Sequence, residues 1–251
     1  MEQNDFIFGI HPVIEAIESG RTVDKLFVKK DLNGELAVRL IHLAREHRIP
    51  VQRVPAERLN RYTRKNHQGV VALMAAVAYH RLGDIVPALF DEGVLPFILV
   101  LDGITDVRNF GAIARTAECC GVNAIVIPER GSVGVGGDAV KTSAGALMNI
   151  PVCREHNLAA GVRYLKESGC AIVAATEKSS RNYTEGDYTA PVALVMGAED
   201  IGISSEILSL ADYRAAIPMF GRIGSLNVGV AAGVMMYEVV RQRLLANLEV
   251  K

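Results

Sequence analysis

The 251-residue chain has no tryptophan, only four cysteines and a formal net charge of −1 at pH 7. The near-zero net charge means that no global electrostatic signature points to nucleic acid. The cysteines form no Cys-x-x-Cys pair, so neither a zinc site nor a dithiol redox pair is indicated. Cys119 and Cys120 are adjacent, which is more typical of buried thiols in a reducing compartment.

Long apolar runs and targeting segments are also absent from the sequence. The longest apolar run beside a predicted strand, Val94 to Leu101, is far too short to span a bilayer. The first residues, Met1 to Asp5, are polar and acidic, unlike a signal peptide. We therefore expect a soluble cytoplasmic protein without a membrane partner.

The composition supports a folded chain with a sizeable core. Half of the residues are hydrophobic, which argues against disorder, and the length suits one large domain or two small ones. The charge is uneven, because residues 1–80 hold 12 Lys and Arg against 9 Asp and Glu, whereas the remainder holds 15 against 19. The small asymmetry places any polyanion-binding surface in the first third of the chain.

Residues 1–78 predict a compact α/β domain with short strands around Leu26–Val28 and Val51–Val54 and a helix over Glu35–His47. Basic residues cluster near its end. Their spacing of three to four residues would place them on one face of a helix, where they suit phosphate contacts and a histidine can stack on a base. An ordinary solvated charged face explains the pattern equally well. These candidate RNA-binding residues are Arg58, Arg61, Arg64, Lys65 and His67.

Residues 79–94 contain turn-forming and charged residues and predict a linker, within which Val86–Phe90 can form a short helix. From residue 95 to residue 251, strands, loops and helices alternate, beginning with the continuous apolar run Phe97–Leu101. Such runs are typical of parallel strands that are buried on both sides. The expected fold class is therefore α/β, with a mostly parallel sheet covered by helices on both faces.

The glycine-rich segment Arg130–Gly137 fits neither common phosphate-binding fingerprint. Ala139 stands where a dinucleotide motif has its third glycine, and Lys141-Thr142 lacks the preceding glycine of a P-loop. This disfavours a metabolic α/β enzyme that binds such a nucleotide.

The segment Ile217–Glu238 predicts the end of a strand, a glycine-rich loop and a helix. Ser225 and Asn227 are the only uncharged hydrogen-bonding side chains between Pro218 and Tyr237, and either can cap the helix. Capping is the simplest role for both. The first turns of the helix are almost wholly apolar or small, which predicts a helix that is buried on every side.

Three polar loops each follow an apolar strand, and parallel strands would bring them to one edge of the sheet. They are Asn109–Arg115, Gly197–Gly202 and Gly221–Asn227. Small neighbours leave room for the Arg115 guanidinium to reach a phosphate, although a surface salt bridge is an equally good explanation. Glu199 is either a site residue or a loop carboxylate that caps a helix.

These loops resemble the three motifs of the SpoU/TrmH group of RNA ribose methyltransferases, in the SPOUT class. The first is Asp102-Gly-Ile-Thr-Asp-x-x-Asn109-Phe-Gly-Ala-Ile-x-Arg115-Thr-Ala, the second is Met196-Gly-Ala-Glu199-Asp-Ile-Gly, and the third is Ile217-Pro-Met219 with Ser225-Leu-Asn227-Val. One motif alone is a weak signal, but all of them in this order are highly specific. Phe8-Gly-Ile-His-Pro12 and His67-Gln-Gly69 resemble the substrate-binding domain of the bacterial ribosomal-RNA guanosine branch.

The resemblance implies methyl transfer from S-adenosylmethionine to a ribose 2'-hydroxyl of RNA, in this branch a guanosine of large-subunit ribosomal RNA. It also implies a C-terminal trefoil knot and a homodimer with its active sites at the interface. No metal is expected, because the sulfonium donor is already activated. The catalytic residues would be Asn109, Arg115, Glu199, Ser225 and Asn227. The cofactor-binding residues would be Thr176, Gly197, Ile217, Met219 and Leu226.

The sequence departs from the family motifs at two places, and the substrate and the function each have one alternative. Gly229 stands where the third motif often has a serine, and Val107-Arg108 replaces a stretch that commonly carries proline. Neither removes a candidate catalytic side chain. Transfer RNA is the alternative substrate, and a non-catalytic RNA-binding factor in ribosome assembly is the alternative function.

Overall fold

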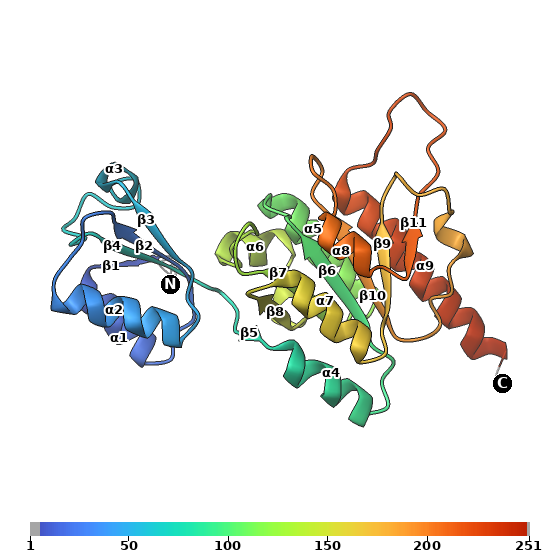
Figure 1. Ribbon diagram of the computed structural model, residues 1–251, viewed down its shortest axis with the longest axis horizontal. Coiled ribbons are helices and arrows are strands. Elements are labelled where there is room, and N and C mark those ends of the chain that lie inside the picture. Colours follow the sequence, from blue (N-terminus) through green and yellow to red (C-terminus); the bar gives the residue numbers. More distant parts are fainter. Residues whose placement is uncertain (1–5, 250–251) are drawn as a thin grey trace. The chain divides into compact units, whose positions relative to one another are not determined.

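The structure is a computed structural model that describes residues 6–249 (Figure 1). The polar residues 1–5, which argue against a signal peptide, lie outside the described residues. The chain divides into two compact units, Met1–Ala78 with Gly134–Val140, and Tyr79–Val133 with Lys141–Lys251. Within residues 6–249, no helix is both long enough and apolar enough to cross a membrane.

The first unit is a four-stranded sheet with α1 and α2 on one face and the short helix α3 on the other. Its strands have the order β1-β4-β2-β3, and only β2 and β3 pair in parallel. Val13 of α1 and Leu40 of α2 pack on Leu26 and Val70 of the sheet, because both helices are apolar on the side facing it. The elements are β1 (Phe6–Phe8), α1 (Ile10–Glu18), β2 (Val23–Lys29), α2 (Glu35–Glu46), β3 (Val51–Val54), α3 (Ala56–Leu59) and β4 (Val70–Met74).

The second unit is built on a seven-stranded sheet in which every neighbouring pair is parallel, with the order β11-β9-β10-β6-β7-β8-β5. The parallel sheet expected from the continuous apolar strands is confirmed. Its strands are β5 (Tyr79–His80), β6 (Phe97–Asp102), β7 (Ala124–Pro128), β8 (Val152–Glu155), β9 (Ala171–Ala175), β10 (Val192–Gly197) and β11 (Tyr213–Ala215).

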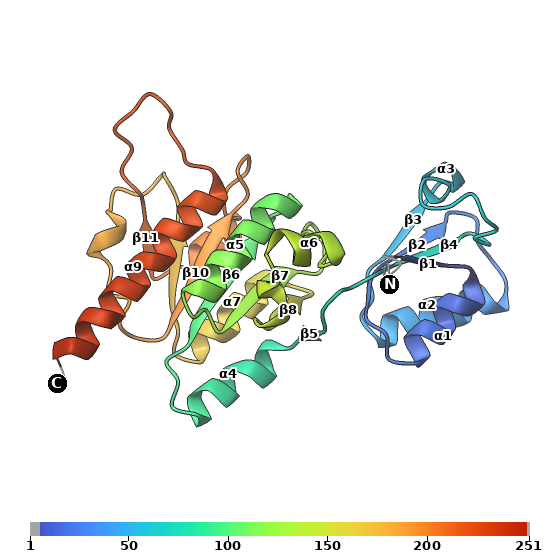
Figure 2. The same ribbon diagram turned by 180° about the vertical axis from the view of Figure 1, so that it is seen from behind.

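The remaining helices include those that cover both faces of this sheet, as expected. They are α4 (Leu82–Asp91), α5 (Val107–Cys119), α6 (Gly137–Thr142), α7 (Leu158–Glu167), α8 (Ser205–Leu210) and α9 (Val228–Glu249), with short 3-10 turns η1 (Ala146–Met148) and η2 (Tyr183–Glu185). Ile98 and Val100 of β6 share one core cluster with Leu82 of α4, Val162 of α7 and Ile207 of α8. Helices α5 and α9 pack against each other on the opposite face (Figure 2).

Residues 79–94, expected to be a linker, contain β5 and α4 and belong to the second unit. Leu82 and Val86 are buried in its core because they lie one turn apart on α4 and face the sheet. The short helix expected at Val86–Phe90 is thus present, but α4 begins earlier, at Leu82.

Two expectations about burial need correction. Helix α9 is not buried on every side, because Val230 and Tyr237 are 55% and 54% exposed. Its opposite side is buried, as Met235 and Met236 show, so the apolar first turns of the helix hide a one-sided packing. Cys119 is exposed, whereas its neighbour Cys120 is buried. Burial raises the pKa of the Cys120 thiol to about 11, which keeps it protonated at neutral pH.

The strand order determines where a site can form. β6 lies at the centre of the sheet, with β7 on one side and β10, which follows much later in the chain, on the other. In the register, Asp102 at the end of β6 pairs with Gly197 at the end of β10. The loops that follow these strands therefore start side by side, which is the usual position of a ligand site in an open parallel sheet.

Candidate active site

A single carboxylate joins the three motif segments, of which the first, Asn109–Arg115, lies in α5 and is not the loop expected from the sequence. Glu199 Oε1 accepts hydrogen bonds from Asn109 Nδ2 at 3.3 Å and from Asn227 Nδ2 at 2.6 Å. Asn227 Nδ2 also donates to Asn109 Oδ1 at 3.0 Å. The three side chains come from α5, from the loop after β10 and from the residue before α9. The expected convergence of Asn109, Glu199 and Asn227 is thus present in the structure.

Helix capping explains part of this arrangement. Asn227 Oδ1 accepts from the backbone N–H groups of Gly229 at 3.0 Å and Val230 at 3.4 Å, so Asn227 is the N-cap of α9. Glu199 Oε1 accepts from the backbone N–H of Val228 at 3.1 Å and places a negative charge at the positive end of the helix. The simpler capping roles of Asn227 and Glu199 are therefore real, and they also fix both side chains in space.

Asn109 lies inside a helix, not before one. The Asp106 side chain caps α5 by accepting from the backbone N–H groups of Arg108 at 2.9 Å and Asn109 at 2.8 Å. The helix consequently begins at Val107, and Asn109 occupies its first turn. The sequence did not single out Asp106, although an aspartate directly before the first helical residue is a common capping signal.

Arg115 and Ser225 stand apart from the hydrogen-bonded group. Arg115 lies on α5 with an exposed side chain, and within residues 6–249 it has no hydrogen-bond or ion-pair partner. The expected alternative, a surface salt bridge, is therefore not formed in the described part of the chain. Ser225 is also exposed and lacks a hydrogen-bond partner among these residues. It lies two residues before Asn227, at the edge of a pocket.

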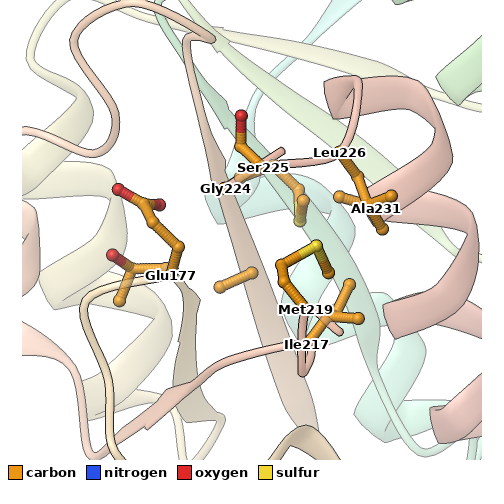
Figure 3. A pocket seen from close by; sticks show the side chains of 10 residues that line it. Glu177, Ile217, Met219, Gly224, Ser225, Leu226 and Ala231 are labelled. Atoms are coloured by element: carbon orange, nitrogen blue, oxygen red, sulfur yellow. The ribbon is translucent and has the colours of Figure 1, made fainter. Parts of the chain in front are cut away.

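This pocket is formed by the ends of β9 and β10 together with the loop before α9 (Figure 3). The cavity itself has a volume of about 90 Å³, and the empty space is about 430 Å³ when the open mouth is included. Most of the lining is apolar, and Glu177 is its one charged side chain. The lining residues are Ala175, Thr176, Glu177, Met196, Ile217, Met219, Gly224, Ser225, Leu226 and Ala231.

Four of the five expected cofactor-binding residues line the pocket, namely Thr176, Ile217, Met219 and Leu226. Gly197 does not line it. A Cβ atom at Gly197 would lie 2.3 Å from the backbone of Gly202 and of Ile203, so this glycine permits a close approach of two backbone segments.

Sequence reasoning did not select Glu177 or Ala231, which also line the pocket. Glu177 follows directly after Thr176 at the end of β9, so its position at a carboxyl strand end is the signal that would have identified it. Ala231 lies on α9 and lines the pocket only because the helix begins beside the strand ends. Within the described residues, no group of three or more His, Cys, Asp or Glu side chains is placed to hold a metal ion.

The basic residues of the first unit do not share a helical face, so that expectation is wrong. Helix α3 ends at Leu59, and Arg61, Arg64, Lys65 and His67 lie in the following loop. Tyr62 leaves the helical path to stack on the Phe27 ring, with 5.4 Å between centroids. The Thr63 and Asn66 side chains accept backbone N–H groups locally, which competes with helix formation.

Arg58 lies on α3 itself. Its guanidinium carbon lies 5.0 Å from the centroid of the Phe27 ring. The His67 ring is held between Asn60 Oδ1 at 2.9 Å and the backbone N–H of Gly69 at 3.0 Å. Because Nδ1 accepts from Gly69, Nε2 carries the hydrogen that is donated to Asn60. Both ring nitrogens are thus engaged within the loop.

Two family models match the chain. Residues 96–237 match the SpoU rRNA methylase family, and residues 6–80 match the RNA 2'-O ribose methyltransferase substrate-binding family. The first model covers more than half of the chain, and its span includes all three motif loops.

Two of the similar proteins described here span nearly the whole chain, and a third spans part of it. A putative TrmH-family tRNA/rRNA methyltransferase of Bacillus subtilis is 38% identical over 242 residues, which cover 96% of this chain and 97% of that protein. The crystal structure of a Streptomyces viridochromogenes SpoU methyltransferase with the cofactor AdoMet has 26% identity and a TM-score of 0.60, and covers 96% and 90% of the two chains. A TrmH/SpoU tRNA-modifying enzyme of A. aeolicus has 33% identity and a TM-score of 0.55, and covers 60% and 77%.

The close approach at Gly197 generates a prediction. Gly197→Ala should destabilise the second unit by about 1–3 kcal/mol, because the new methyl group meets backbone that cannot move without shifting the turn that carries Glu199. Gly221→Ala is the matched control, since a Cβ there meets no atom within 4 Å. Urea denaturation followed by circular dichroism measures both variants. Equal stability of the two would contradict this account of Gly197.

Proposed function

Because the chain belongs to the SpoU/TrmH family of RNA 2'-O-ribose methyltransferases, we propose that it methylates the 2'-hydroxyl of a guanosine in large-subunit ribosomal RNA. S-adenosylmethionine is the methyl donor in this proposal. The observation that carries it is the position of the Asn109–Glu199–Asn227 group beside the pocket. Ser225, Leu226 and Asn227 connect the two along one short loop.

The residues of the pocket fit the cofactor. The apolar walls formed by Met196, Ile217 and Leu226 suit an adenine ring, and the polar groups of Thr176 and Glu177 suit hydroxyl or ammonium groups. The donor supplies a methyl group on a sulfonium centre when it is bound. The protein is left with the tasks of aligning the ribose hydroxyl and stabilising the geometry for proton removal.

Within this scheme, Glu199 is a positioning residue. Its Oε1 atom already accepts three hydrogen bonds, so its main effect is to hold Asn109 and Asn227 in place. Arg115 binds the phosphate and ribose of the target nucleotide, because a guanidinium is a fork-shaped donor that does not normally release its proton. Ser225, whose hydroxyl is uncommitted, completes the group at the mouth of the pocket.

The first unit supplies the RNA contacts in this proposal. The match of residues 6–80 to a substrate-binding model supports this role. Arg58, Arg61, Arg64 and Lys65 would contact phosphates individually from the loop around α3, since they do not form a helical face. His67 would act by shaping the loop, because its ring nitrogens are engaged.

A transfer-RNA target is the second candidate, since the Bacillus relative is described as a tRNA/rRNA methyltransferase. The deciding experiment maps ribose 2'-O-methylation in total RNA from cells with and without this protein. We expect loss of one guanosine methylation in large-subunit ribosomal RNA. Loss of a transfer-RNA methylation would show that transfer RNA is the substrate instead. Unchanged methylation of all RNA would contradict the proposal.

The role of Arg115 gives a sharper prediction. Arg115→Lys should lower the methylation rate by roughly 10- to 100-fold, because lysine cannot reproduce bidentate hydrogen bonds to a phosphate. Arg163→Lys on α7 is the control, since Arg163 is also an exposed arginine on a helix. Transfer of labelled methyl groups to purified ribosomal RNA measures the rate. A methylation rate of Arg115→Lys close to that of the wild type would disprove bidentate binding of the target phosphate by Arg115.

The proposal includes the homodimer and the trefoil knot implied by the family. Val230, Tyr237 and Leu244 are exposed and recur every seven residues, so they form one apolar stripe on α9. A second copy of the chain is the partner that we expect on this stripe.

Analytical ultracentrifugation tests the dimer. The sedimentation of the wild-type protein should give a mass twice that of its 27.1 kDa chain. Tyr237→Arg should give the mass of a single chain, because the new charge would be buried in the dimer interface. Val38→Arg is the control, because Val38 is an exposed apolar residue in the first unit. Monomeric wild-type protein, or an intact Tyr237→Arg dimer, would overturn this part of the proposal.

A further inference from the structure

A second pocket lies within the first unit, between the loop after β2 and the loop before β4. One wall contains Lys29, Asp31 and Asn33, and the other contains Lys65 and Asn66. Its volume is about 370 Å³, which is large enough to admit a small molecule or one part of a larger one. Sequence analysis selects Lys65 as a candidate RNA-binding residue, but it indicates neither the pocket nor the wall that contains Lys29, Asp31 and Asn33.

The loop that forms the second wall is held in a fixed and partly strained conformation. His67 braces it through both ring nitrogens. Gln68 has a backbone φ of 51°, which residues other than glycine rarely adopt. Its Oε1 atom accepts a hydrogen bond from the backbone N–H of Ile10 at 3.1 Å. Gly69 lies so close to the opposite wall that an added Cβ would be 3.1 Å from Leu32. Strain that the surroundings maintain is characteristic of preorganised binding loops.

Several polar groups at this pocket remain available to a ligand. Within residues 6–249, neither the Lys65 ammonium nor the Asn33 side chain has a hydrogen-bond partner. Asn66 Oδ1 accepts from the backbone N–H of Gln68 at 3.3 Å, which leaves its amide N–H groups as donors. Lys29 is paired with Asp31 at 3.0 Å, and both side chains remain partly exposed.

We propose that this pocket holds one unpaired nucleotide of the RNA substrate. Ammonium groups suit a phosphate, carboxamides suit the hydrogen-bonding edge of a base, and Leu32 adds an apolar contact for its ring. A base enters a concave site only when it lies outside a helix, so the inference specifies a bulged or looped nucleotide and not a paired one. It rests on the proposed function, because that function makes RNA the substrate.

The test compares two hairpin RNAs that differ only by one bulged nucleotide, bound to the full-length protein in fluorescence anisotropy. We expect wild-type protein to bind the bulged hairpin roughly tenfold more tightly, the difference that one base contact typically provides. Asn33→Ala with Asn66→Ala should abolish this preference, and Lys65→Ala should weaken it. Arg21→Ala, which removes an exposed charge outside the pocket, should leave it unchanged.

Photocrosslinking provides a second measurement that does not depend on the variants. A 4-thiouridine at the bulge should crosslink to peptides that contain residues 29–33 or 64–69. Crosslinks confined to other peptides, or equal affinity of wild-type protein for both hairpins, would overturn the inference. Preserved bulge preference in the double variant would also overturn it.

The nucleotide pocket and the proposed methyltransferase function can be tested separately. Calorimetric binding of S-adenosylmethionine by the pocket variants should match the wild type, because the cofactor pocket belongs to the second unit. Loss of the bulge preference with intact cofactor binding supports the nucleotide pocket. A protein that binds the bulge but never methylates RNA would refute the proposed function and leave the pocket assignment standing.

Discussion

The hydrogen bonds to Glu199 Oε1 hold together parts of the chain that are far apart in the sequence. One oxygen accepts from Asn109 on α5, from the side chain of Asn227 and from the backbone of Val228 at the start of α9. These contacts are available only because β6 and β10 are neighbours in the parallel sheet and end at the same level. The sheet topology therefore determines the site.

The same residues serve both the fold and the proposed chemistry. Asn227 and Glu199 satisfy backbone N–H groups that a helix of 22 residues would otherwise leave free at its first turn. In doing so they are fixed beside a pocket whose wall is the preceding loop. A capping role and a catalytic role do not exclude each other here, because the geometry that satisfies the helix is also the geometry that orders the site.

Much of the second unit could be predicted from the sequence because its signals are local. Apolar runs such as Phe97–Leu101 indicate buried parallel strands, and loops at their carboxyl ends indicate a site. The resemblance in three ordered motifs then identified Asn109, Glu199 and Asn227, which the structure brings together. The same resemblance grouped Thr176 with Met219, and both residues line one pocket.

The features that escaped prediction depend on contacts between distant residues. Helix α3 stops early because Tyr62 stacks on Phe27, a ring on another strand. The one-sided burial of the first turns of α9 depends on what packs against them, which a run of apolar and small residues does not reveal. The close approach of Gly197 to the backbone of Gly202 and Ile203 also joins parts of a turn that no sequence pattern connects. Local patterns carry no information about such partners.

We propose that the end of β9 with Thr176 and Glu177, Met196 of β10 and the loop before α9 form one pocket for the methyl donor. Hydrogen exchange of the full-length protein, measured with and without saturating S-adenosylmethionine, tests it most directly. The account predicts that amides around residues 175–177 and 217–226 are protected together in a single titration. Protection of other segments only, or no protection at all, would contradict it.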